Sequence, residues 1–111
     1  MSLSTHILDT ARGLPAQGVA VVAERLEGAA FVRVGAGVTD GDGRARDLVA
    51  GEEGLTPGEY RLTFATGPYF EALGVPSFYP QVTISFTVRD DRHHHVPLLL
   101  APWGYSTYRG T

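Results

Sequence analysis

Histidine is the residue type in this sequence best suited to chemistry at neutral pH. Three of the four histidines are consecutive, His93 to His95, and the fourth is His6. Side chains alternate along a strand, so a strand through the run would place His93 and His95 on one face and His94 on the other. Imidazole gains and loses protons near neutrality, which makes histidine a candidate for acid and base catalysis.

Two other interpretations of these histidines remain open. A lone histidine in a strand, such as His6, is more often structural than catalytic, and a partly solvated run can satisfy its own hydrogen bonds. Zinc is the second alternative, because His93 and His95 share a face and His6 could supply a third ligand. A structural zinc site takes four ligands. We therefore expect no metal site, and zinc only as an adventitious ion.

An acidic turn precedes Arg44, and its spacing excludes an EF-hand. An EF-hand loop needs glycine at its sixth position and glutamate at its twelfth. Counted from Asp40, those positions hold Ala45 and Gly51. Without further information, Arg44 is a solvated arginine that follows a hairpin turn.

The last stretch of the chain, Tyr-Ser-Thr-Tyr-Arg-Gly-Thr, is aromatic and rich in hydroxyl groups. Alternation with period 2 separates Trp103, Tyr105 and Thr107 from Gly104 and Ser106, which predicts a strand over residues 103–109. Chain ends usually fray when nothing holds them. We expect this segment to be docked on the fold.

Composition describes an ordinary globular chain. The 111 residues are 43% hydrophobic and 19% charged, and a chain of this length can bury a core without crosslinks. The net charge of −3 gives no basic surface for nucleic acid. The absence of cysteine excludes disulfides and thiolate metal sites and fits a cytoplasmic protein.

Membrane and export signals are not expected. The opening residues MSLSTHILDT lack the basic and apolar regions of a secretory peptide. The longest apolar stretch, near Val96, is far shorter than the roughly 20 residues that span a bilayer.

Short strands separated by turns predict an all-β sandwich of one domain, residues 1–111. Residues 18–26 fit a helix or a strand, and their valines favour a strand. Pro68 and Gly74 bracket a short helix, because proline suits a first helical turn and glycine suits the position after the last. A loop rich in Gly and Glu precedes Pro57-Gly58. We expect strands over residues 3–8, 18–26, 31–38, 44–48, 59–66, 81–88, 92–100 and 103–109, with the helix over 68–74.

Four segments of the chain also resemble one enzyme family. The sequence HHHVPLLLAPWGYSTYRGT is similar to the ending HYHVPLLLSPxxYSTYRGS of the 5-hydroxyisourate hydrolases, the transthyretin-like enzymes of urate breakdown. LSTHILDTARGLPA (residues 3–16), TDGDGRA (39–45) and YFEALGVPSFYPQVTISFTV (69–88) resemble the same family. The resemblance covers nearly the whole chain.

This resemblance implies a fold, an assembly and an activity. The fold is a transthyretin-like sandwich of two four-stranded antiparallel sheets with one short helix. The assembly is a homotetramer, a dimer of dimers with active sites where the dimers meet. The activity is hydrolysis of 5-hydroxyisourate to 2-oxo-4-hydroxy-4-carboxy-5-ureidoimidazoline, with no metal or organic cofactor. The implied partners are this small substrate and further copies of the chain, without nucleic acid or membrane.

The family motifs also imply site residues. The histidines of STH and HYH correspond to His6 and His95 as catalytic residues, and the DGR arginine, Arg44, joins them because its fixed charge suits an oxyanion. This sequence departs from the family at Asp40 (usually Asn), His94 (usually Tyr) and Thr111 (usually Ser). The substrate-binding residues implied are His6, Arg44, Tyr108, Arg109, Gly110 and Thr111.

Two other functions are less consistent with these residues. A transthyretin-type carrier for a small hydrophobic ligand should lack the two histidines and the short TYRG(S/T) ending, both of which this sequence has. An Ig-like interaction module has a framework of paired cysteines around a tryptophan, and this chain has no cysteine.

Overall fold

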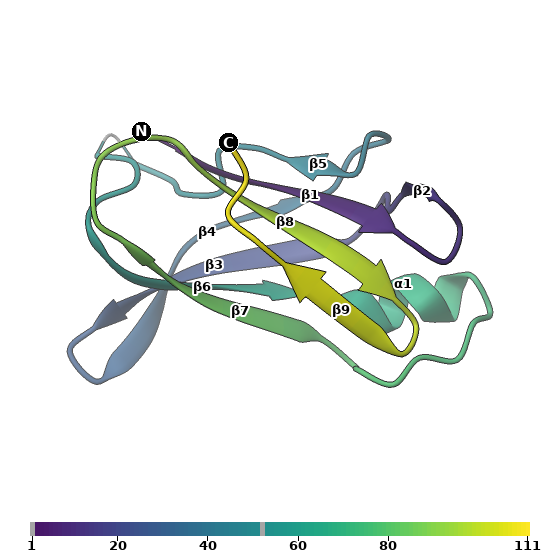
Figure 1. Ribbon diagram of the computed structural model, residues 1–111. Coiled ribbons are helices and arrows are strands. Elements are labelled where there is room, and N and C mark those ends of the chain that lie inside the picture. Colours follow the sequence, from purple (N-terminus) through teal and green to yellow (C-terminus); the bar gives the residue numbers. More distant parts are fainter. Residues whose placement is uncertain (1, 52) are drawn as a thin grey trace.

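The computed structural model describes residues 2–51 and 53–111; Met1 and Glu52, the latter in the expected Gly- and Glu-rich loop, lie outside these ranges. The described residues form two stacked sheets and a short helix (Figure 1). In chain order the elements are β1 (Leu3–Asp9), β2 (Leu14–Pro15), β3 (Ala20–Glu27), β4 (Ala30–Val38), β5 (Arg44–Ala45), β6 (Gly58–Phe64), α1 (Thr66–Ala72), β7 (Val82–Val88), β8 (His94–Ala101) and β9 (Gly104–Thr107).

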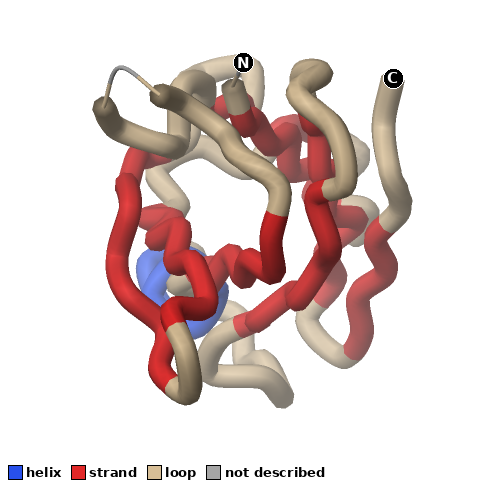
Figure 2. Tube along the Cα trace, turned by 90° about the vertical axis from the view of Figure 1, so that its left-hand side faces the viewer, coloured by secondary structure: helices blue, strands red, loops and turns tan. Residues whose placement is uncertain are grey.

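The two sheets have different topologies. Within the described residues, one sheet runs β4-β3-β6-β7 and is antiparallel throughout. The other runs β2-β1-β8-β9, with β5 paired to the same edge of β1 as β2. Figure 2 shows the strands of both layers around the interior, with the helix beyond them. The sandwich brings β1, β5, β8 and β9 into one sheet, and these strands or their ends carry the candidate site residues.

The all-β sandwich with one short helix is confirmed. The strand expected over 44–48 is only two residues long, as β5, and two further details differ from the expectation. One sheet has five strands among the described residues, because Leu14 and Pro15 pair with Leu8 and Asp9 as β2. Gly13, at φ 70°, takes part in the turn that connects β1 to β2. The second difference is that β1 and β8 are parallel. A parallel pair needs a long connection between its strands. Here the strands of the opposite sheet and α1 form that connection and return the chain to the end of the sandwich where β1 begins.

Alternation along β1 and β8 decides which side chains face the core. Leu3, Thr5 and Ile7 of β1 are fully buried. Val96 and Leu98 of β8 are also buried, with 6% and 0% of their surface exposed. They pack against inward residues of the opposite sheet, among them Tyr60, Leu62 and Phe64. The intervening residues of β1 and β8 consequently face outward, away from the core.

The helix was predicted close to its true place. α1 spans Thr66–Ala72, two residues earlier than expected, and Gly74 follows its end at φ 69°. Its first turn is held by a backbone hydrogen bond from Gly67 N–H to the Pro80 carbonyl (3.0 Å). Among the described residues, no helix is long and apolar enough to cross a membrane.

The segment after β5 ties the two sheets together. Leu48 N–H donates to the Leu3 carbonyl of one sheet (2.9 Å), and Ala50 N–H donates to the Val34 carbonyl of the other (2.8 Å). The Leu48 side chain is fully buried. The Leu48 backbone also crosses directly over Gly35 of β4, where a Cβ atom would lie 1.7 Å from the Leu48 carbonyl oxygen. This crossing fixes the chain that leads from β5.

Candidate active site

The pairing of β1 with its two neighbours gathers side chains from distant parts of the sequence. In the parallel β1–β8 pair, Ser4 lies beside His95, and in the antiparallel β1–β5 pair, His6 lies beside Arg44. Paired residues project to the same side of a sheet. Ser4, His6, Arg44 and His95 therefore share the outer face, while His94 is buried on the inner face. The opposite orientations expected for His94 and His95 are confirmed.

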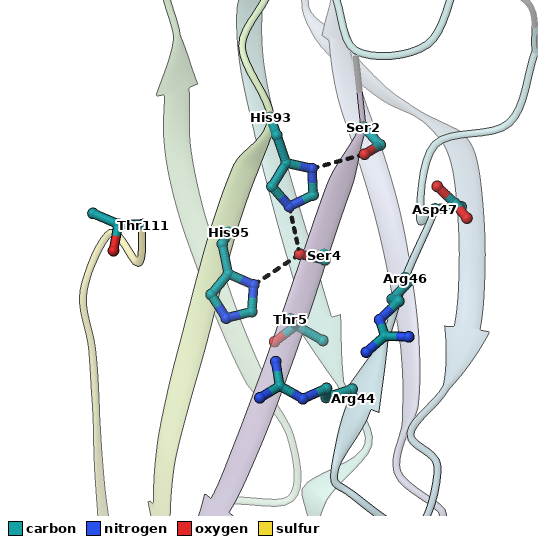
Figure 3. Close-up of a pocket in the computed structure, with 9 residues that line it drawn as sticks. All are labelled: Ser2, Ser4, Thr5, Arg44, Arg46, Asp47, His93, His95 and Thr111. Atoms are coloured by element: carbon teal, nitrogen blue, oxygen red, sulfur yellow. Dashed lines mark hydrogen bonds between the residues drawn. The ribbon is translucent and has the colours of Figure 1, made fainter.

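A pocket of about 270 Å³ opens on this outer face. It combines β1, β5, β8 and the end of the chain (Figure 3). All of the residues that line it have polar side chains, which carry guanidinium, imidazole, carboxylate and hydroxyl groups. The lining residues are Ser2, Ser4, Thr5, Arg44, Arg46, Asp47, His93, His95 and Thr111.

Hydrogen bonds hold the two pocket histidines in place. Ser4 Oγ lies 2.7 Å from His95 Nδ1 and 2.9 Å from His93 Nε2, and Ser2 Oγ lies 2.7 Å from His93 Nδ1. Because Nδ1 of His95 is engaged with Ser4, its other ring nitrogen, Nε2, is the one left for a ligand. Figure 3 shows both rings beside the β1 strand, with the Arg44 guanidinium below His95.

The surroundings of His95 favour its neutral form. Burial lowers the pKa of His95, and the proximity of the Arg44 charge and of the His6 and His93 rings lowers it further. A histidine with a lowered pKa is neutral at neutral pH and can accept a proton. Arg44 is always charged, so the pocket combines a proton acceptor with a fixed positive charge.

The turn before β5 orients Arg44. Asp40 Oδ1 accepts hydrogen bonds from the backbone N–H groups of Asp42 (2.9 Å) and Arg44 (3.0 Å). These bonds lower the pKa of Asp40 and keep it ionised. The Asp in place of the family's Asn accepts both bonds in this turn. Gly43, at φ 75°, lets the chain enter β5.

The end of the chain docks on His95. Thr107 Oγ1 donates to the Pro97 carbonyl (2.7 Å), and Gly110 N–H donates to the His95 carbonyl (2.8 Å). A Cβ atom at Gly110 would lie 2.5 Å from Cδ2 of the His95 ring, so the tail passes directly over this histidine. The docked tail is confirmed. The expected strand over 103–109 is too long, because β9 ends at Thr107 and pairing resumes only at Gly110.

The structure brings together some of the expected site residues. Arg44, His95 and Thr111 line the pocket, and Gly110 packs against His95. His6 lies beside Arg44 on the same face but is not among the residues that line the pocket. Tyr108 and Arg109 line a neighbouring depression of about 230 Å³ between β7 and the β8–β9 pair, which His95 also borders.

Several pocket residues were not identified from the sequence as functional. They are Ser2, Ser4, Thr5, Arg46, Asp47 and, outside the zinc hypothesis, His93. Ser4 lies two positions before His6, and Arg46 two after Arg44, so the period of a strand was the available signal. A third ligand for zinc is not provided: among residues 2–51 and 53–111, no group of three or more His, Cys, Asp or Glu is arranged to hold a metal ion.

Comparison with known proteins agrees with this geometry. The model of the HIUase/Transthyretin family matches residues 3–110. The chain is 52% identical over 114 residues to the 5-hydroxyisourate hydrolase of Caulobacter vibrioides. This alignment covers 98% of this chain and 97% of the relative. Its fold matches the structure of Klebsiella pneumoniae 5-hydroxyisourate hydrolase with a TM-score of 0.86 and 41% identity over the full length of both chains.

The fold is also close to that of a carrier protein. Sea bream transthyretin in complex with thyroxine matches with a TM-score of 0.92 and 29% identity, covering 100% of this chain and 96% of the other. Backbone similarity therefore does not separate hydrolases from carriers. The residues of the pocket must do so.

Proposed function

We propose that this chain, which belongs to the HIUase/transthyretin family, is an enzyme that hydrolyses 5-hydroxyisourate to 2-oxo-4-hydroxy-4-carboxy-5-ureidoimidazoline in urate degradation. The observation that carries the proposal is His95, whose pKa is lowered by burial and by Arg44 and whose ring is held by Ser4 in a polar pocket beside Arg44. A water-activating base next to a fixed positive charge is what hydrolysis of an amide-like bond needs.

The proposed mechanism begins with water. Nε2 of His95 removes a proton from the water as its oxygen attacks the ring carbonyl carbon. The negative charge that develops on the carbonyl oxygen is stabilised by Arg44. The C–N bond then breaks, and the leaving nitrogen takes a proton. We propose His6, which lies beside Arg44 on the same face, as the group that orients the leaving side or supplies this proton.

The chain end is proposed to hold the flat substrate ring. Thr111 lines the pocket, and Gly110 brings the tail against His95. Tyr108 and Arg109 line the depression on the other side of His95, and we propose them as binding residues reached from that side. Thr111 keeps the hydroxyl of the usual serine, so it can make the same hydrogen bonds.

The polar pocket argues against the carrier alternative. A thyroxine-type ligand is hydrophobic, and such ligands are usually bound by apolar linings. Here the pocket presents Arg44, Arg46, His93 and His95. The hydrolase relatives are also more similar in sequence, at 52% for the Caulobacter enzyme against 29% for the sea bream carrier.

A direct assay tests the activity. Urate oxidase would generate hydroxyisourate in a cuvette, and its decay would be followed by absorbance with and without this protein. We expect the protein to accelerate decay well beyond the spontaneous rate. An unchanged rate at micromolar protein would reject the hydrolase function. A cytoplasmic location for the reaction stays a prediction.

Assembly into a homotetramer is proposed to complete the site. Within the described residues β7 and β9 each pair on one side only, so both sheets end in a free edge. Large apolar side chains are exposed near these edges: Trp103 (69%), Phe78 (64%) and Tyr105 (41%). We expect sedimentation at micromolar concentration to show a dimer of dimers, with the pocket at the contact between dimers. A monomer at that concentration would contradict the proposal.

The pH dependence of the reaction should report the state of His95. Because burial and then Arg44, His6 and His93 lower the pKa of His95, we expect the acidic limb of kcat/KM to lie below about 6.5, the ordinary value for histidine. His95 is the neutral base above that limb and is protonated and inactive below it. Asp47 and Arg46 are further charged side chains that line the same pocket as His95. Initial rates measured from about pH 5 to about pH 8 cover this range.

Arg44→Gln is the control for this pH profile. After burial, the charge of Arg44 is the next cause of the lowered pKa of His95. Without that charge the acidic limb of kcat/KM should move to higher pH, toward the ordinary histidine value. The rate itself should fall as well, because the oxyanion loses its positive charge. An acidic limb that lies above the ordinary value in the unmodified protein would exclude His95 as the base.

A further inference from the structure

A path of hydrogen bonds leads from the pocket histidine to the protein surface. Its links are His95 Nδ1 to Ser4 Oγ (2.7 Å), Ser4 Oγ to His93 Nε2 (2.9 Å) and His93 Nδ1 to Ser2 Oγ (2.7 Å). All lie within hydrogen-bonding range, and Figure 3 shows them as one continuous line. Ser4 is buried, at 7% exposure, whereas His93 is exposed.

The chemistry of Ser4 links the protonation of the two rings. A serine hydroxyl has one proton to donate. Between two neutral imidazoles, Ser4 therefore donates to one ring nitrogen and accepts from the other. The path has two arrangements. In the first, Nδ1 of His95 carries a proton and Nε2 is free to act as a base. In the second, every proton of the path has shifted by one place and Nε2 of His95 carries the proton.

The proposed hydrolysis needs His95 to pass on the proton that it takes from water. Opening the ring produces a carboxylic acid, which is ionised at neutral pH because carboxyl pKa values lie near 4. The nitrogen that leaves becomes part of a ureido group, which is not basic enough to keep an additional proton. Each turnover therefore releases one proton to the surroundings. His95 itself is covered by the tail at Gly110.

We propose that Ser4, His93 and Ser2 form a proton relay that carries the proton taken up by His95 out to solvent. This inference rests on the proposed function, and it makes Ser4 and His93 positioning residues that act through His95. When Nε2 of His95 takes the proton of the attacking water, the Nδ1 proton passes to Ser4. The Ser4 proton passes to Nε2 of His93, the Nδ1 proton of His93 passes to Ser2, and the Ser2 proton passes to bulk water.

The relay leaves His95 ready for the second half of the reaction. After the shift His95 is neutral again, with its proton on Nε2, the nitrogen that faces the substrate. In this form Nε2 can donate its proton to the leaving nitrogen while the reverse shift brings one proton in from solvent to Nδ1 and restores the base. The net proton of the turnover is then the one released when the product acid ionises. Burial and the nearby Arg44 support this use, because both disfavour a lasting imidazolium at His95.

His93→Gln tests proton transfer separately from positioning. Glutamine keeps a hydrogen-bond donor and acceptor but does not pass a proton between two ring nitrogens. In dilute buffer we expect kcat to fall by about tenfold, less than the hundredfold or more that loss of a general base itself costs. KM should stay unchanged. Added imidazole should restore kcat in a concentration-dependent way, after subtraction of enzyme-free decay, and should leave the unmodified protein nearly unaffected.

A second measurement needs no substrate. In ¹⁵N spectra of the histidine rings, Ser4→Ala should change the ratio of the two neutral forms of His95, and Ser4→Thr should restore it because threonine keeps the hydroxyl. Ser77→Ala is the matched control, since Ser77 lies between α1 and β7 and does not line the pocket. It should leave rates and spectra unchanged.

The outcomes separate the two proposals. If the unmodified protein does not accelerate hydroxyisourate decay, the proposed function fails and the relay fails with it. If the unmodified protein is active but His93→Gln shows no dependence on buffer, the relay alone is overturned. Identical His95 ring spectra in Ser4→Ala and the unmodified protein would also overturn it. A purely structural role for His93 predicts a loss of rate that added imidazole does not repair.

Discussion

We expect His95→Asn to lower kcat for hydroxyisourate by about a thousandfold, within the range that general acid–base catalysis contributes. Asparagine is similar in size and can still hydrogen-bond to Ser4, which lies 2.7 Å from His95 Nδ1. It cannot accept a proton from water at neutral pH. The tail should remain in place, because the Gly110 N–H bonds to the backbone carbonyl of residue 95 (2.8 Å) and not to its side chain.

His94→Tyr is the matched control for this experiment. His94 is adjacent in sequence but points into the protein, at 5% exposure, with Nδ1 bonded to the Arg92 carbonyl (2.7 Å). Tyrosine is the middle residue of the HYH motif that this segment resembles. We expect kcat within about twofold of the unmodified value, far from the change at His95. Full activity in His95→Asn would show that the pocket on this face is not the active site.

The second large effect is on stability. Gly35→Ala should destabilise the protein by about 3 kcal/mol or more, at the upper end of what overpacking costs. A Cβ atom there would lie 1.7 Å from the Leu48 carbonyl oxygen and 2.6 Å from its carbon, and both are backbone atoms. Leu48 is fully buried and bonded to Leu3, so it cannot move aside cheaply. For a chain of this size the midpoint of thermal unfolding should drop by roughly 13 °C or more.

Gly37→Ala provides the comparison, because it lies two residues along the same strand. Its Cβ would meet the Leu48 Cδ2 atom at 3.1 Å, so the end of that side chain, and not the backbone, would have to shift by a few tenths of an ångström. Replacing a strand glycine also reduces the freedom of the unfolded chain, which stabilises by up to about 1 kcal/mol. We expect little change or a small gain, measured by thermal or urea unfolding. Equal losses of stability in Gly35→Ala and Gly37→Ala would contradict the close passage of the Leu48 backbone over Gly35.

Local sequence patterns determined most of the secondary structure. Alternating apolar residues predicted strands where β6 and β7 occur, and Pro68 with Gly74 predicted the short helix within two residues. The period of a strand also separated His94 from His93 and His95. These features depend on interactions between residues close in the chain, so a single sequence carries them. The resemblance to the hydrolases likewise rested on motifs that can be read without coordinates.

The tertiary structure decided what no local pattern contains. The parallel pairing of β1 with β8 places Ser4 against His95, 91 residues apart, and it depends on how the two sheets close around the core. The same closure ends β9 at Thr107 and carries Gly110 back over His95. It also separates Tyr108 from Arg44, although both belong to family motifs. The sequence by itself determined which residue types could perform hydrolysis; long-range strand pairing decided which of them share one pocket, because contacts across a sheet are set by register and not by proximity in the chain.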